Sequence, residues 1–169
     1  WTSRGQDGSS YGVYAQRYDR TGLAQGGEFQ VSNVTSNVQT NPSIAMDEDG
    51  DFIIAWQGID SNSYGIFAKR YSKNGIPKEN EFQVNTYTSF EQRQASIAVD
   101  SDGDFVVTWQ SRNQDGDSAG IYAQKYNKLG FKEGGEFQIN TFTTDRQTLP
   151  SIAFSEEGDF LFVWQSDNQ

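Results

Sequence analysis

A fifteen-residue pattern occurs three times in this chain and limits what it can fold into. It reads PSIAMDEDGDFIIAW at 42–56, ASIAVDSDGDFVVTW at 95–109 and PSIAFSEEGDFLFVW at 150–164. Each copy is a short strand, an acidic turn with glycine and a longer apolar strand ending in tryptophan, as in a β-hairpin. Tryptophans at 1, 56, 109 and 164 give spacings of 55, 53 and 55 residues. Such equal units predict a repeat architecture.

The repeat divides residues 1–169, which we expect to form a single domain, into units 1–55, 56–108 and 109–163, with 164–169 beginning a fourth. Each unit contains four strand-like segments, which in one copy are Ser43–Asp47, Asp51–Gln57, Gly65–Tyr71 and Glu81–Asn85. In the second segment Phe52, Ile54 and Trp56 share one face, and Ile53 and Ala55 share the other. Because both faces are apolar, the sheet must be covered on both sides. The fourth segment alternates apolar and polar residues, as an exposed edge strand does.

These features predict an all-β fold made of β-propeller blades, each a four-stranded antiparallel meander. A two-sheet sandwich stays open as an alternative, although it gives no reason for equal units. The chain starts and stops after the second strand of a unit, so the terminal blade is split. We expect it to be completed by a second copy, as a homodimer of six blades, or by neighbouring repeats of a longer chain. Met46 is the only methionine, so we expect a processed product or a segment of a longer protein.

The composition excludes several classes of function. The formal net charge of −10 argues against nucleic acid and against anionic membranes, which both need clustered Lys and Arg. No apolar run approaches the roughly 20 residues needed to insert into a bilayer. Neither cysteine nor histidine occurs, so thiolate and imidazole chemistry are excluded.

The acidic turns are candidate calcium sites. Carboxylates alternate along the first two copies and are Asp47, Asp49, Asp51, Asp100, Asp102 and Asp104. Oxygen ligands beside a glycine suit Ca²⁺, although the run is shorter than an EF-hand loop and the third copy has Ser155, Glu157 and Asp159. The alternative is a structural turn, in which Asp accepts backbone hydrogen bonds and Gly takes a positive φ. That alternative is favoured.

Other candidates lie in the turns between the second and third strands. Asp7 and Asp115 offer a further acidic site, and Tyr11 and Tyr64 are candidates to face a ligand, although Ala119 replaces them in the third unit. Trp56 and Trp109 are in phase with buried positions, which favours core packing over sugar stacking. The repeated Gln39, Gln92 and Gln147 either satisfy backbone groups of the preceding loop, which is favoured, or line a pocket near the axis.

The fragments GIYAQKY, GGEFQIN, LPSIA and GDF..VWQS resemble the roughly fifty-residue tandem repeats of large secreted bacterial surface proteins. Those proteins are cyanobacterial or proteobacterial and carry the repeats beside calcium-binding, adhesin-type regions. The resemblance covers the whole chain. It implies an extracellular or cell-surface location and a structural or adhesive role, and it carries no catalytic site.

These observations predict a non-enzymatic extracellular module for adhesion, assembly or ligand binding. Catalysis needs a group that differs from its counterparts in the other units, and no such group stands out. The alternative is a carbohydrate-binding, lectin-like propeller, or one that cleaves glycans with carboxylates alone, as glycosidases do.

Overall fold

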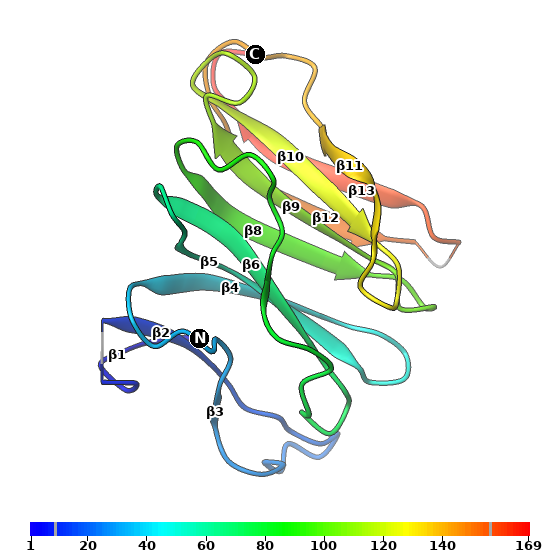
Figure 1. Ribbon diagram of the computed structural model, residues 1–169. Helices are drawn as coiled ribbons and strands as arrows, with labels where there is room; N and C mark the ends of the chain where they lie inside the picture. The colour runs from blue at the N-terminus through cyan, green and yellow to red at the C-terminus, as the bar shows by residue number, and fades with distance from the viewer. Residues whose placement is uncertain (9, 156) are drawn as a thin grey trace.

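A computed structural model describes residues 1–8, 10–155 and 157–169. These residues form four antiparallel sheets, which follow one another as a fan from the N-terminal to the C-terminal end of the chain (Figure 1). The two termini lie at opposite ends of the fan. The described residues include no helix with the length and hydropathy required to cross a bilayer.

The two middle sheets are complete four-stranded blades. Their strands pair in chain order, with β4 (Gln39–Met46), β5 (Phe52–Ile59), β6 (Tyr64–Tyr71) and β7 (Phe82–Gln83) in one, and β8 (Gln92–Val99), β9 (Phe105–Arg112), β10 (Ala119–Tyr126) and β11 (Lys132–Gln138) in the other. This meander confirms the fold expected from the repeat.

The two terminal sheets are partial blades. The N-terminal sheet contains β1 (Thr2–Arg4), β2 (Tyr11–Ala15) and β3 (Phe29–Gln30), and the C-terminal sheet contains β12 (Gln147–Phe154) and β13 (Phe160–Ser166). By position in the repeat, the first sheet holds the outer strands of a blade and the last sheet holds the inner ones. The expected split of the terminal blade is therefore present.

The inner strands begin earlier than the sequence pattern indicated. β4 starts at Gln39, whereas the expected segment started at Ser43. The register shifts between Thr40 and Ser43, and β4 pairs with β5 on both sides of this shift. Asn41 has a φ of 53° there, and Gln94 and Leu149 have positive φ at the equivalent points. A bulge of this kind hides a strand from a period-two pattern. β7 is also shorter than expected and spans two residues.

Each complete blade is covered on both faces, as the apolar pattern of β5 predicted. Phe52, Ile54 and Trp56 pack in one core cluster with residues of the N-terminal sheet such as Val13. Ile53 and Ala55 belong to another cluster, which includes β8 and β9 of the next blade. Trp56 and Trp109 are fully buried, so the interpretation of the tryptophans as core residues is confirmed.

Candidate functional site

The two ends of the strands form opposite faces of the molecule. We call the end with turns 47–51 and 100–104 the turn face. We call the end where β8 and β12 begin and β9 ends the loop face. Each face carries a polar cavity.

On the turn face, the aspartates hold the turns together. Asp47 Oδ1 accepts a hydrogen bond from the Asp51 amide at 2.9 Å, and Asp100 Oδ1 accepts from the Asp104 amide at 2.9 Å. In the third copy Ser155 Oγ accepts from the Asp159 amide at 3.2 Å. Because a hydroxyl replaces the carboxylate in the same role, the turn needs an oxygen acceptor and not a charge.

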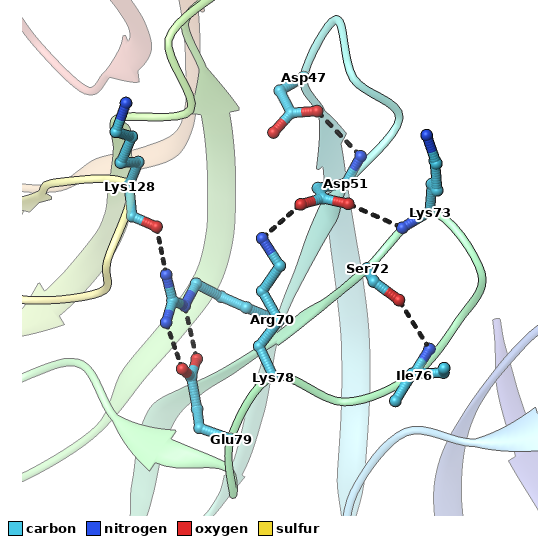
Figure 2. A network of polar contacts seen from close by, with 9 residues as sticks. All are labelled: Asp47, Asp51, Arg70, Ser72, Lys73, Ile76, Lys78, Glu79 and Lys128. Carbon is cyan, nitrogen blue, oxygen red and sulfur yellow. Dashed lines mark hydrogen bonds and ion pairs between the residues drawn. The ribbon is translucent and has the colours of Figure 1, made fainter.

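The structure brings four of the six candidate calcium ligands to one cavity of about 210 Å³, which is lined by Asp47, Asp49, Asp51 and Asp102 and also by Arg70, Lys78 and Lys128. Figure 2 shows that basic side chains lie in this region. Lys78 pairs with Asp51, and Arg70 pairs with Glu79 and donates to the Lys128 carbonyl. The hydrogen bond with Lys78 lowers the pKa of Asp51.

The Asp104 carboxylate also has a hydrogen-bond partner, since its Oδ1 accepts from the Lys128 amide at 2.9 Å. Among the described residues, no three acidic side chains converge in a way that suits a metal ion. The carboxylates of Asp47, Asp51, Asp100 and Asp104 thus accept from backbone amides or pair with lysine, as the structural-turn alternative predicts. Calcium binding stays a prediction of the sequence pattern.

Asp7 and Asp115 lie on the loop face, in equivalent turns with Asp60. A side chain added at Gly12 would come within 2.8 Å of Asp7 Oδ2, and one added at Gly65 would come within 2.8 Å of Asp60 Oδ2. These carboxylates therefore lie against the backbone at the start of the third strand of each unit. Asp115 also accepts from Gln138 Nε2 at 3.4 Å. Their geometry is that of repeated structural turns.

In the loop-face cavity, two of the charged lining residues differ from their counterparts in the other units. It has a volume of about 320 Å³ and is lined by Glu91, Gln110, Arg112, Ser118, Ala119 and Arg146. Glu91 and Arg146 immediately precede the repeated glutamines Gln92 and Gln147, and the first unit has Val38 at that position. Asymmetry of this kind is what catalysis in a repeat protein requires.

Glu91 is the half-buried carboxylate of this cavity. Its Oε1 lies 2.9 Å from Arg93 Nη2, and its Oε2 lies 4.0 Å from Arg112 Nη1. The Arg93 guanidinium also stacks on Tyr64, with Cζ 4.1 Å from the ring centroid. The candidate Tyr64 is thus joined to the cavity through Arg93, whereas Tyr11 lies on the N-terminal sheet beside Arg4.

Sequence reasoning missed Glu91, Arg112 and Arg146. The signal was available: in an otherwise regular repeat, the residue before each repeated glutamine is Val38, Glu91 or Arg146. The glutamines themselves are structural, as expected. Gln92 Nε2 donates to the Ser89 carbonyl at 3.0 Å, and Gln147 Nε2 donates to the Thr144 carbonyl at 2.9 Å.

No protein-family model matches the chain, and no curated protein is similar to it. Solved structures do resemble it. An endo-arabinase from Bacteroides thetaiotaomicron VPI-5482 has 14% identity and a TM-score of 0.52, and the match covers 79% of this chain and 53% of that one. An α-L-arabinofuranosidase from Lactobacillus brevis has 10% identity and a TM-score of 0.50, covering 91% of this chain and 61% of that one.

A thermostable family-43 glycoside hydrolase gives 11% identity and a TM-score of 0.50, again over 91% of this chain and 61% of that one. The chain thus spans less than two thirds of each of these proteins. Together with the fan of four-stranded sheets, the likeness establishes an all-β, partial propeller fold. The expectation of a non-enzymatic adhesion or assembly module is contradicted, because the similar propellers are glycan-cleaving enzymes.

Proposed function

We propose that this chain belongs to a propeller that binds a glycan at the loop face and cleaves it with carboxylates. The observation that carries the proposal is the cavity holding Glu91, whose carboxylate is replaced by Val38 and Arg146 at the equivalent positions of the other units. The similar folds of arabinose-polymer and arabinofuranoside hydrolases support it and direct the choice of first substrates.

The cavity has the groups that recognise sugar hydroxyls. Arg112 and Arg146 are donors, the Gln110 amide both donates and accepts, and the Glu91 carboxylate accepts. Sugar hydroxyl groups form hydrogen bonds with such side chains, and Arg112 and Arg146 are exposed, so a glycan can reach them. Tyr64 adds an aromatic ring that stacks on Arg93, and Arg93 pairs with Glu91 of the cavity.

Glycosidic bond cleavage uses two carboxylic groups, one as acid and the other as base or nucleophile. Glu91, which lies beside Arg93 and Arg112 in the cavity, is our candidate for the second of these roles. Two further carboxylates are next to lining residues in the sequence: Asp117 precedes Ser118, and Asp145 precedes Arg146. The Asp145 amide donates to Asp117 Oδ2 at 3.1 Å, which holds the two turns together.

The test is release of reducing sugar from arabinan, arabino-oligosaccharides and a panel of other plant and bacterial glycans. We expect Glu91→Gln to lower the turnover number by about 100-fold or more, because general acid–base groups contribute about 10²–10⁴-fold. Asp117→Asn and Asp145→Asn identify the second carboxylate. Asp49→Asn, on the turn face, is the matched control and keeps full activity.

Saturable glycan binding without any cleavage would reject the hydrolytic part of the proposal and leave a lectin-like propeller. Absence of both binding and cleavage across the panel would reject the whole. An extracellular location remains a prediction of the repeat type and is part of this proposal.

A further inference from the structure

Apolar side chains at the two ends of the fan are exposed, although their counterparts inside the chain are buried. Tyr18 is 64% exposed, whereas Tyr71 is 1% exposed. Ile44 on β4 is 57% exposed, whereas Ile97 at the same place in β8 is buried. Leu161 on β13 is 69% exposed, whereas Val106 in β9 is fully buried. The ends therefore expose the interior surfaces of blades.

A repeated aromatic stack identifies what belongs on these surfaces. Tyr71 stacks on Phe52 of its own blade at 5.0 Å between centroids and meets Phe29 of the preceding sheet at 5.5 Å. Tyr126 repeats this with Phe105 at 4.8 Å and Phe82 at 5.5 Å. The third set of equivalent residues is Tyr18, Phe160 and Phe137, and each of its members is exposed.

Tyr18 follows β2 in the N-terminal sheet, whereas Phe137 is in β11 and Phe160 in β13, at the opposite end of the fan (Figure 1), so one copy cannot bring the three together. We propose that two copies of this chain join reciprocally, with β13 of each copy adding to β2 of the other. Each joint then makes a whole blade from the β12–β13 hairpin of one copy and β2 and β3 of its partner. Two such joints close a ring of six blades, and the interface continues the blade-to-blade packing already present within each copy.

β13 offers a free edge for this pairing, and β2 offers the part of its edge that β1 does not occupy. In the described part of the chain β13 pairs with β12 alone, on the side opposite the free edge. β2 ends at Ala15, whereas β6 and β10 continue three residues further to Tyr71 and Tyr126. The register of β5 with β6 places Ala55 opposite Ala68, so by repeat equivalence Val163 of one copy lies opposite Ala15 of the other.

Polar contacts between blades also have a third, open copy. Glu81 accepts from the Asn33 amide of the sheet before it at 2.6 Å, and Glu136 accepts from the Thr86 amide at 2.6 Å. The equivalent carboxylate in the N-terminal sheet is Glu28, and the equivalent amide is that of Thr141. The proposed joint brings these two groups together from different copies.

The joint requires that the end of β13 of one copy replaces β1 of its partner beside β2. Trp164–Asp167 of one copy and Trp1–Arg4 of its partner occupy equivalent positions, and both would pair with Tyr11–Tyr14. We infer that β1 gives way. It is three residues long, whereas the end of β13 is held by β12 through the pair Gln147 and Ser166 and by the Asp167 amide, which donates to the Arg146 carbonyl at 2.9 Å.

The experiment measures the mass of the intact chain in solution by light scattering and sedimentation over a range of concentrations. We expect twice the monomer mass of 18.9 kDa. Leu161→Lys should give a monomer, because a charge replaces an apolar side chain at the joint. Ile76→Lys is the matched control: Ile76 is as exposed but lies in a turn of a complete blade, and this variant stays dimeric.

Crosslinking checks the register independently of that variant. The chain has no cysteine, so Ala15→Cys with Val163→Cys introduces the sole thiols. Directly opposed positions in an antiparallel pair have the separation that a disulfide needs. We expect oxidation to yield covalent dimers from the double variant and none from either single variant. A wild-type monomer at high concentration, or a dimer that survives Leu161→Lys and does not crosslink, overturns the proposal.

Discussion

At the residue scale, a buried hydrogen bond between two side-chain amides joins each of two loops to the inner strand that follows it. We call this contact the amide relay. Asn85 Nδ2 donates to Gln92 Oε1 at 3.2 Å, and Asn140 Nδ2 donates to Gln147 Oε1 at 3.2 Å. The first unit has Ser32 in place of asparagine, and no donor among the described residues reaches Gln39 Oε1. A buried acceptor without a partner costs free energy, so the first relay is the weakest.

Ser32→Asn should repair this relay and raise the free energy of unfolding by about 1 kcal/mol. The new Oδ1 would also accept from the amide of Val13, as Asn85 Oδ1 accepts from Ile66 at 2.7 Å. Urea unfolding measures the change. The reverse substitution Asn85→Ser is the control and should destabilise by about 1–3 kcal/mol; equal stability of both variants with wild type would contradict the relay.

The acidic turns allow a comparison that the chain itself supplies. Asp100→Ser should be tolerated, because Ser155 already fills this role, whereas Asp100→Ala should cost about 1 kcal/mol through the lost amide acceptor. Thermal melting with and without chelator belongs to the same experiment. A large fall in melting temperature on chelation would support the calcium prediction against the fit of these carboxylates to backbone amides.

Buried tyrosines make the fold sensitive to alkali. Burial, together with Asp115 and Glu136, raises the pKa of Tyr122 from 10.0 to about 12. The folded chain therefore keeps a proton that the unfolded chain loses, and stability falls as the pH rises from 10 towards 12. We expect tyrosinate absorbance and loss of the β-sheet circular dichroism signal to develop together in that range. Tyrosinate forming well before unfolding would contradict this.

At the element scale, an arginine joins each of the first two sheets to the sheet that follows. Arg17 donates to the Asn74 carbonyl, and Arg70 donates to the Lys128 carbonyl (the latter in Figure 2), both in turns of the following blade. Gly130 has a φ of 84°, and a Cβ added there would lie 2.8 Å from the Arg70 guanidinium, so both the turn and this contact favour glycine. The blades are thus joined on the turn face by a repeated contact as well as by apolar packing.

Arg70→Met should lower the free energy of unfolding by about 2 kcal/mol, because Glu79 loses its partner and a turn carbonyl loses its donor. Arg17→Met is the matched variant. Its contact is exposed, so we expect a loss of less than about 1 kcal/mol. Chemical denaturation of both variants ranks them, and an equal loss would show that burial does not set the strength of the contact.

At the scale of the whole molecule, the interior interfaces are complete and the terminal ones are open. The proposed dimer exchanges β1 for β13 of a partner, so the stability of β1 opposes association. Ser3 lies opposite Gly12 in the β1–β2 ladder, and proline there has no amide to donate.

Ser3→Pro should therefore tighten the dimer and lower its dissociation constant by about threefold to tenfold, in proportion to a weakened ladder contact of about 1 kcal/mol. Sedimentation equilibrium measures this. A weaker dimer in this variant would indicate that β1 belongs to the joint and that the end of β13 is the segment displaced.

The sequence by itself determined the blade. Equal spacing of tryptophans, apolar residues on both faces of 52–56 and glycine turns require a covered four-stranded meander, because these are local patterns that recur. They also predicted the buried tryptophans and the loop-facing role of the repeated glutamines. The bulged starts of β4, β8 and β12 were missed, because a residue with positive φ breaks the period-two pattern.

Only the tertiary structure decided which polar residues meet. Glu91, Arg112 and Arg146 come from different strands and loops, and their convergence depends on how one sheet lies against the next. Within a blade, the pairing of its strands brings Asp51 and Asp104 to the amides of Lys73 and Lys128. Repetition encodes a scaffold, whereas a site arises where the repeat is broken, and distances between broken positions are set by the assembled fan of sheets.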